Sequence, residues 1–406
     1  MNGIFAIDKP SGISSNQFMM KLQKALTNSH VFSKEIQRAT AERIREYQEQ
    51  TGKKASKRKL RKVSKVKMGH GGTLDPLASG VLVIGIGTGT KRLSEYLSGT
   101  VKEYESEALF GTSTTSGDVE GEILSQNSVK QLEFNELKTV EEKFKGSLKQ
   151  TPPIFAALKM DGKPLYEYAR EGKPLPRAIE PRQVTVYDLK ILPDSLSRSH
   201  NYPLLRPTSG QTKELVERLN NGLLNDPLYF SKEYCTKQGW ENESVDIKSK
   251  ELTEEESKQI ETQGDDYRAP LLHFKATVSS GTYIRSLVND IGKSMESSSY
   301  MVKLIRLAQK DWSLEKQNVF KLEDFTERDE KVWSKVLQEV LEKGSKVNVV
   351  EALLQAEEEL KKEQKIAAEQ TEQAEQAEQA EQAEQTEQTN KPEASGLDNK
   401  KRKLEE

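Results

Sequence analysis

The run GHGGTLDPLASG, from Gly69 to Gly80, places one acid between glycines and a proline just before an apolar stretch. Glycine permits backbone conformations that other residues avoid and lets a ligand approach the chain closely. Pro76 biases Asp75 toward an extended backbone and away from a helix. The apolar run that follows, Val81 to Ile86, is typical of a buried strand. The pattern predicts a fixed loop that presents a carboxylate, although glycine, aspartate and proline also form ordinary turns.

Hydrophobic periodicity predicts both helices and strands on either side of this loop in the sequence. Asn16 to Leu26 has the apolar spacing of a helix, with Ser14 or Ser15 as its N-cap. Strands are predicted at Val101 to Phe110, Gln183 to Leu192 and Leu272 to Ser279, and an amphipathic helix at Thr282 to Met295. The Leu272 stretch alternates apolar and polar residues, which favours a half-buried antiparallel strand. Strands with intervening and flanking helices indicate the α+β class.

Charge is distributed unevenly along the 406 residues, although the net charge is only −2. Residues 351–406 carry 16 acidic and 8 basic residues, which leaves residues 1–350 with a net charge of +6. The last part repeats Ala-Glu-Gln from Ala368 to Gln388, and such a tract has little apolar surface to bury. We therefore expect one catalytic domain over 1–350 and a low-complexity acidic tail over 351–406 that is dispensable for chemistry.

Two segments of the expected domain are interpreted as inserts. The first, at about 30–68, is polar, and its half from Lys53 to Lys67 holds nine Lys and Arg without an acid. This basic run is consistent with a solvated tract, with a nuclear address or with attraction of RNA phosphates. The second insert, at about 193–270, contains Trp240 and several tyrosines, and we expect it to be partly ordered.

Several classes of protein are disfavoured by composition. The single cysteine, Cys235, rules out an internal disulfide and favours a reducing compartment. The four histidines lack paired metal-ligand spacing, so no catalytic zinc site is expected. No apolar stretch approaches the ~20 residues of a membrane span. The predicted first strand starts close to Met1, so we expect no secretory signal.

Several motifs along the chain resemble those of the TruB-type pseudouridine synthases. Besides the Gly69 loop, they are Ile4 to Ser15, Lys102-Glu103-Tyr104, Thr151 to Lys159, Leu165 to Gly172, Ser280 to Arg285 and Leu304-Ile305-Arg306. They occur in family order over most of Asn2 to about Leu192 and Leu271 to about Phe325. The resemblance implies a pseudouridine synthase fold with a mixed, largely antiparallel sheet. It also implies isomerisation of the T-loop uridine, position 55 of transfer RNA, without metal or cofactor.

The resemblance assigns roles to individual residues. Asp75 is implied as the catalytic carboxylate, acting as a nucleophile or as a base. Arg285 is implied as its partner, since a nearby cation favours the ionised carboxylate. Tyr104 is implied to stack on the target base and to assist proton removal from C5. The remaining implied RNA-binding or substrate-binding residues are His70, which fills the space of the flipped uridine, Tyr283, Leu304 and Arg306. Lys9 and Lys91 are further candidates for this set, through phosphate contacts or structural contacts.

Two other functions stay open at this point. One is a guide-RNA-dependent pseudouridine synthase, although the acidic repeats here replace the RNA-binding domain of that class. The other is an RNA-binding or tRNA-folding protein in which catalysis is secondary. For the stand-alone synthase, the expected partners are the tRNA T-arm and other RNAs with T-loop-like hairpins, bound by a monomer without a small-molecule cofactor or a membrane. The basic residues from Lys400 to Lys403 are compatible with a nuclear address, and we expect a nuclear and cytoplasmic protein. Eukaryotic members of the family also modify mitochondrial transfer RNAs, but no transit peptide is visible in this sequence.

Overall fold

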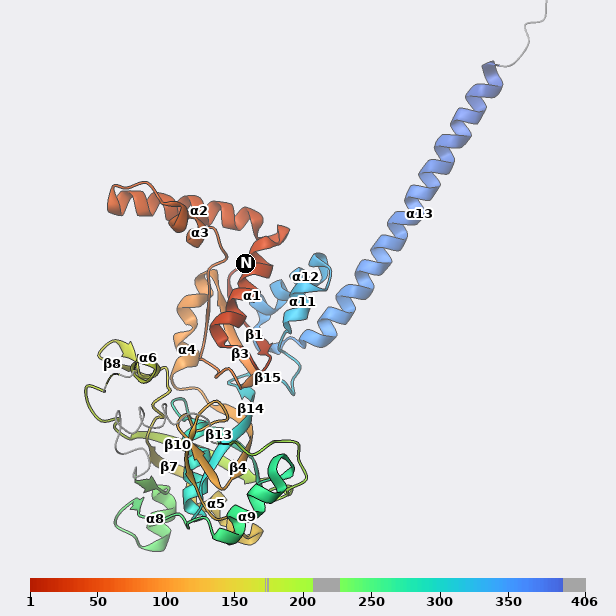
Figure 1. Cartoon of the computed structure of the whole chain (residues 1–406). Helices are drawn as coiled ribbons and strands as arrows, with labels where there is room; N and C mark the ends of the chain where they lie inside the picture. Colours follow the sequence, from red (N-terminus) through yellow and green to blue (C-terminus); the bar gives the residue numbers. More distant parts are fainter. Residues whose placement is uncertain (172, 174, 207–226, 390–406) are drawn as a thin grey trace, which may run out of the picture. The chain divides into compact units, whose positions relative to one another are not determined.

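A mixed sheet of nine strands forms the centre of the first unit (Figure 1). The computed structural model describes residues 1–171, 173, 175–206 and 227–389, and it divides the chain into a unit ending at Ala352 and another starting at Leu353. The sheet order is β1 (Gly3–Lys9), β3 (Ser79–Ile86), β14 (Ser299–Gln309), β4 (Lys102–Phe110), β13 (Leu271–Val278), β10 (Arg182–Ile191) and β7 (Gly146–Gln150). In addition, β2 (Met68–His70) pairs with β3 and β15 (Trp312–Ser313) with β14.

Only β3 and β14 pair in parallel among these strands, and all other neighbours are antiparallel. The predicted α+β class and the mixed, largely antiparallel sheet are therefore confirmed. The three strands predicted from the sequence correspond to β4, β10 and β13. Their predicted ends differ from the observed ends by about one residue, which is ordinary for such boundaries. In β13 the even-numbered side chains from Leu272 to Val278 are buried, as the alternation predicts.

The predicted helices also form. The first, α1 (Ser15–Asn28), has Ser14 as its N-cap, in a capping box with Gln17. The second, α10 (Ile284–Ser294), packs against β14 and buries Leu287, Val288 and Ile291. Further elements of this unit are η1 (Gly87–Arg92), α4 (Ser94–Leu97), β5 (Thr112–Thr114), β6 (Ile123–Gln126), α5 (Phe134–Phe144), β8 (Lys159–Met160), β9 (Lys163–Pro164), α6 (Leu165–Glu171), α11 (Leu322–Thr326), α12 (Glu330–Lys343) and η3 (Gly344–Lys346).

Both inserts contain elements that the sequence interpretation missed. The first forms two helices, α2 (His30–Thr51) and α3 (Lys57–Val63), rather than an irregular polar segment. Phe32 is the one residue of α2 classed as buried, so periodicity gives little signal there. The described part of the second insert contains β11 (Leu228–Tyr229), α8 (Lys232–Gln238), β12 (Ser244–Val245), α9 (Glu254–Gln263) and η2 (Gly264–Asp266).

The acidic tail begins within a long helix, α13 (Val349–Thr389). Its first turns bury Val349, Leu353 and Ala356, whereas residues 361–379 are all exposed. The basic run from Lys400 to Lys403 lies outside the described residues. Within the described chain, no helix combines the length and apolar character needed to cross a membrane.

Removal of residues 362–406 is expected to leave kcat/KM within about twofold of the full chain, because the described side chains from 362 to 379 are exposed and contribute little burial. A cut after Glu351, which the composition alone favoured, would also remove the buried Leu353 and Ala356. The check is a steady-state comparison of the two truncations with the full chain. A large rate loss on removing 362–406 would show that the exposed part of α13 takes part in the reaction.

Candidate active site

Asp75 lies in the loop that joins β2 to β3, and α1 fixes this loop from one side. The Ser15 hydroxyl accepts from the Leu74 N–H at 2.9 Å and donates to the Leu74 carbonyl at 2.8 Å. The Gly12 N–H donates to the Pro76 carbonyl at 2.8 Å. Hydrogen bonds on both sides of Asp75 therefore hold its backbone in place, as a preorganised catalytic group requires.

Lys9 packs beneath the same loop, and its contacts are structural, which is one of the two roles expected for it. Its side chain is 0% exposed, and Nζ donates to the carbonyls of Pro10 at 2.9 Å, Ile13 at 2.7 Å and Pro76 at 3.5 Å. Burial lowers the pKa of Lys9 to about 8, although the negative charge of Asp75 opposes this. A side chain without exposed surface cannot contact a phosphate, so Lys9 acts as a tie between the opening turn and the loop.

Arg306 likewise makes structural contacts within the chain. It is 1% exposed, and it donates from Nε to the Val81 carbonyl at 2.6 Å and from Nη2 to the Gly72 carbonyl at 3.3 Å. The parallel pairing of β14 with β3 places the backbone of Arg306 against Gly80. A Cβ atom on residue 80 would lie 2.3 Å from the Arg306 carbonyl oxygen. Gly80 also has φ +103°, so this approach requires glycine.

Arg285 reaches Asp75 from the first turn of α10. Nε lies 2.9 Å from Oδ2 of Asp75 and Nη2 lies 3.3 Å from Oδ1, which is a two-bond fork. The guanidinium is fixed further by the carbonyls of Ser116 at 2.8 Å from Nη1 and Phe155 at 3.0 Å from Nη2. The Arg285 side chain is 5% exposed and that of Asp75 is 34% exposed. The structure thus brings the two predicted residues together and leaves Asp75 open to a ligand.

Asp118 is a second carboxylate beside Arg285, and the sequence interpretation missed it. Its Oδ2 lies 3.7 Å from Arg285 Nε, and Oδ1 accepts from the Ser116 hydroxyl at 2.5 Å and the Glu120 N–H at 3.0 Å. Burial raises the pKa of Asp118, although the Arg285 charge opposes this. The local sequence, Ser116-Gly117-Asp118, has the composition of an ordinary turn, so it gives no signal of a buried acid.

Asp118→Asn is expected to lower turnover about tenfold while the free energy of unfolding stays constant or rises. A raised pKa in the folded state means that the ionised carboxylate opposes folding at neutral pH, and this cost disappears as the pH falls through that pKa. The amide avoids the cost, but Arg285 then has one carboxylate instead of two. Single-turnover kinetics and urea unfolding at pH 7 measure both effects, with the exposed Asp311→Asn as control. Turnover equal to that of the control would remove Asp118 from the site.

Three predicted pocket residues lie on the sheet and at the start of α10. Tyr104 on β4 is the cross-strand partner of Arg306, and Leu304 is the partner of Ser106, so both side chains lie on one sheet face. Both are buried. Tyr283 caps α10, two residues before Arg285, and packs against Ala156, Met160 and Leu165. Burial raises the pKa of Tyr283, opposed by nearby Arg182 and Arg285.

The two remaining predicted residues differ in their surroundings. His70 lies at the end of β2, half-buried, opposite Ile84 of β3. Burial, together with the positive charge of Arg306, lowers the pKa of His70, so the imidazole is neutral near pH 7. Lys91 lies in η1 after β3 and is exposed, without a hydrogen bond or ion pair to another described residue. The structure does not bring Lys91 into contact with Asp75.

A cavity of about 1040 Å³ is lined by Arg285 and by Ser116, whose carbonyl binds Arg285, but Asp75 does not line it. Its wall also includes Thr151 to Ile154 and Ser244 to Ser249 of the second insert. The cavity therefore adjoins Arg285 on a side that Asp75 does not line.

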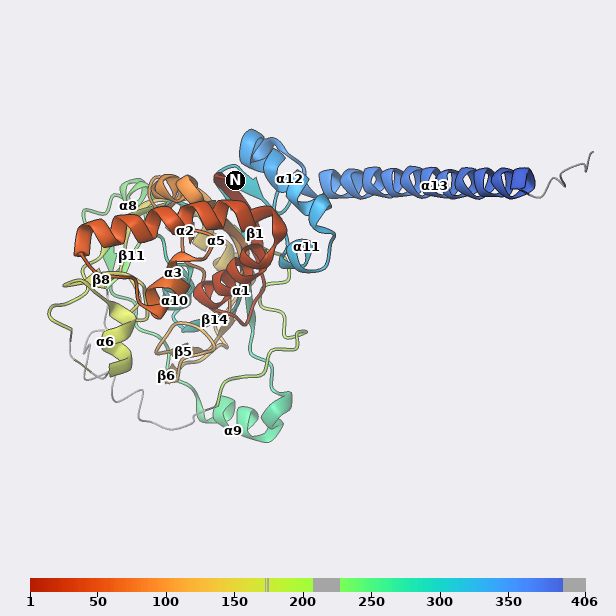
Figure 2. The same cartoon turned by 90° about the horizontal axis from the view of Figure 1, so that it is seen from above.

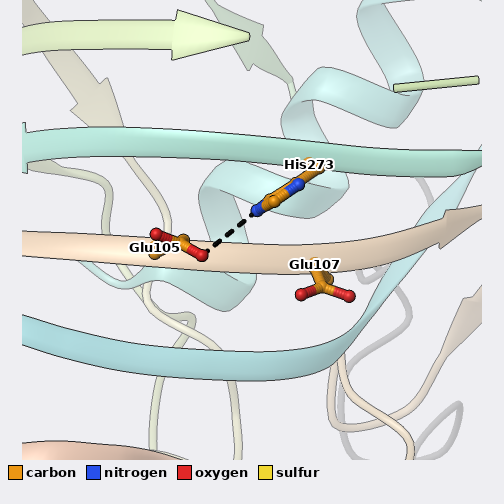
Figure 3. Close-up of side chains that lie close together, drawn as sticks. All are labelled: Glu105, Glu107 and His273. Carbon is orange, nitrogen blue, oxygen red and sulfur yellow. Dashed lines mark hydrogen bonds and ion pairs between the residues drawn. The ribbon is translucent and has the colours of Figure 1, made fainter. Parts of the chain in front are cut away.

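A separate polar cluster lies on the opposite sheet face from Tyr104. Glu105 and Glu107 of β4 and His273 of β13 place oxygen and nitrogen atoms within 4.8 Å of one another (Figure 3). Each group already has a partner within the chain: Lys275 lies 3.1 Å from Glu105, Lys303 lies 2.6 Å from Glu107, and His273 Nδ1 lies 2.8 Å from Asp194. The cluster is explained as a charge network on the sheet, separate from the Asp75 site.

The family model and the curated relatives agree on one family. A protein-family model described as "TruB family pseudouridylate synthase (N terminal domain)" matches residues 57–201. "tRNA pseudouridine synthase 4" of Saccharomyces cerevisiae is 74% identical over 361 residues, covering 89% of this chain and 90% of its own. The protein of that name from Schizosaccharomyces pombe is 35% identical and covers 80% of this chain and 82% of its own. A chain in "Crystal Structure of a Cbf5-Nop10-Gar1 Complex" is 18% identical, covers 79% of this chain and 53% of its own, and has a TM-score of 0.38.

Proposed function

This chain belongs to the TruB family of pseudouridylate synthases, and we propose that it isomerises a T-arm uridine of transfer RNA to pseudouridine without a guide RNA. The family predicted from the motifs is confirmed. The names of the two relatives support transfer RNA as the substrate. The observation that carries the proposal is the fixed Asp75 carboxylate, held by Arg285 at 2.9 and 3.3 Å and exposed on one side.

The reaction requires no net addition or loss of atoms. The bond from ribose C1′ to uracil N1 breaks, the base turns while it stays bound, and a new bond forms between C1′ and C5. The proton on C5 leaves and N1 ends with a proton. One carboxylate is sufficient to start this sequence, either as a nucleophile or as a base that removes a sugar proton.

Asp75 is the carboxylate that we assign to this step. Either route uses the ionised carboxylate, and the two-bond fork from Arg285 orients it. The carbonyls of Ser116 and Phe155 accept hydrogen bonds from the Arg285 guanidinium. The guanidinium is therefore oriented toward Asp75 before RNA binds. Because Arg285 is almost fully buried, it acts on the carboxylate and not on a distant phosphate.

The neighbouring side chains form the surface for the base. Tyr104 stacks on the uracil and assists removal of the C5 proton, while Tyr283 and Leu304 line the pocket. A uridine inside a folded loop is inaccessible to a carboxylate, so it has to flip out of its stack. His70, a neutral and half-buried ring, occupies the space that the uridine leaves.

Release of tritium from a full-length transfer-RNA transcript labelled at uridine C5 tests the proposal. The purified protein is used alone, with EDTA and without any other RNA. We expect about one tritium released per transcript. Tight binding without release would make the protein an RNA-folding factor, and release only after a second RNA is added would make it guide-dependent. Either result overturns the proposal.

A further inference from the structure

A basic groove lies between α2 and α3, at a distance from the Asp75 site. The groove, called here the α2–α3 groove, encloses about 570 Å³. The two helices lie side by side in both views (Figures 1 and 2). Its lining cations are Arg58, Lys59, Arg61, Lys62, Lys65 and Lys67, joined by Arg43 from α2. No acidic residue is among the lining residues.

The groove is held in shape by contacts that do not use its exposed charges. Arg43 Nη1 donates to the carbonyls of Val63 at 2.7 Å and Lys65 at 3.2 Å, which fastens the end of α3 to α2. On the other side of α3, Lys59 Nζ lies 4.7 Å from the centre of the Tyr47 ring. The cations are therefore presented by a folded surface and not by a loose segment.

Five of the lining cations are uncompensated. Arg58, Arg61, Lys62, Lys65 and Lys67 are exposed, and none forms an ion pair with an acid in the described part of the chain. Like charges gathered on one surface repel, and a bound polyanion relieves this repulsion. Regularly spaced phosphates suit such a groove better than a single small anion does.

The groove lies at the end of β3 that is remote from Asp75. The Gly87 N–H donates to the Lys67 carbonyl at 2.8 Å, and Met68 pairs with Ile86, the last residue of β3. Asp75 precedes Ser79, the first residue of the same strand. Seven residue steps of an extended strand span roughly 23 Å. An RNA that places its uridine at Asp75 therefore reaches the groove with a different part of its backbone.

We propose that the α2–α3 groove binds the sugar–phosphate backbone of the substrate RNA outside its T-loop, an inference that rests on the proposed function. Phosphate contacts of this kind position an RNA and raise its affinity without reading its sequence. A receptor that binds a basic run as an extended peptide would have to unfold α3 first. The folded groove thus favours RNA over a nuclear address, the other role that this run allows. The contact extends recognition from the T-arm to the rest of the transfer RNA.

The test compares two full-length variants that lose the same charge. The groove variant combines Arg58→Gln, Arg61→Gln, Lys62→Gln and Lys65→Gln, and the control combines the exposed Lys190→Gln, Lys258→Gln, Lys316→Gln and Lys331→Gln. Affinity is measured across salt concentrations for a full-length transfer-RNA transcript and for a T-arm hairpin. Pseudouridine formation in the hairpin is followed in parallel, and circular dichroism checks that both variants fold.

For the groove variant we expect about tenfold weaker binding of the full transcript, and a slope of log K against log salt that is smaller by about 3. The control should change the slope by less than about 1, and hairpin turnover should stay within about twofold for both variants. A groove variant indistinguishable from the control would overturn the proposal. So would a groove variant that keeps RNA affinity but loses binding to a purified nuclear import receptor. Failure of the proposed function is distinct, because the wild-type protein would then form no pseudouridine at all.

Discussion

Asp75→Asn is expected to lower turnover about 10⁴-fold while tRNA affinity changes by less than about twofold. The amide neither attacks ribose C1′ nor removes a sugar proton. The fold should persist, because Arg285 keeps the carbonyls of Ser116 and Phe155 and the carboxylate of Asp118. Single-turnover tritium release gives the rate, and filter binding gives the affinity.

A matched control keeps this result interpretable. Asp188→Asn removes an exposed carboxylate that pairs with Lys145 on the surface, so it should behave like the wild type. If Asp75→Asn retained a tenth of the wild-type rate at unchanged affinity, another residue would have to be the catalyst. A loss of both rate and affinity would instead show that the loop depends on this side chain for its conformation.

Arg285→Met is expected to lower the free energy of unfolding by about 3–5 kcal/mol and turnover by at least about 100-fold. The change leaves Asp118 buried without its cation, and it leaves the carbonyls of Ser116 and Phe155 without their donors. It also removes the two hydrogen bonds that orient Asp75. Urea unfolding and single-turnover kinetics measure the two losses separately.

Two companion variants assign these losses to their causes. Arg285→Lys keeps the positive charge but not the planar fork, so it should recover part of the stability and little of the rate. Combining Arg285→Met with Asp118→Asn should also recover stability, because the unpaired buried charge is gone. A loss below about 1 kcal/mol for Arg285→Met alone would contradict the buried pairing.

The elements with strong local signals could be predicted from the sequence. Alternation in β13, helical spacing in α10 and the Ser14 cap of α1 each report on neighbouring residues, so they need no knowledge of the tertiary structure. The family resemblance supplied the pairing of Asp75 with Arg285, which spacing alone does not provide. The structure adds the geometry of that pair.

Other features depend on contacts between distant segments. Asp118 sits in turn-like sequence, and only the approach of α10 makes it a buried partner of Arg285. The sequence makes Lys9 and Arg306 candidate binding residues but cannot show their packing, and in the structure both turn inward onto carbonyls of the loop and of β3. The helix α2 has Phe32 as its buried residue, so it lacks the apolar face that periodicity detects.

The central claim is that Asp75 and its neighbours convert one T-arm uridine without help from another RNA. The most direct measurement incubates the purified full chain with a T-arm hairpin alone and maps pseudouridine chemically at every uridine. The claim predicts conversion at one loop uridine, near completion, in the wild-type protein. It is contradicted if the hairpin binds but no uridine is converted, or if conversion is scattered over the stem and loop.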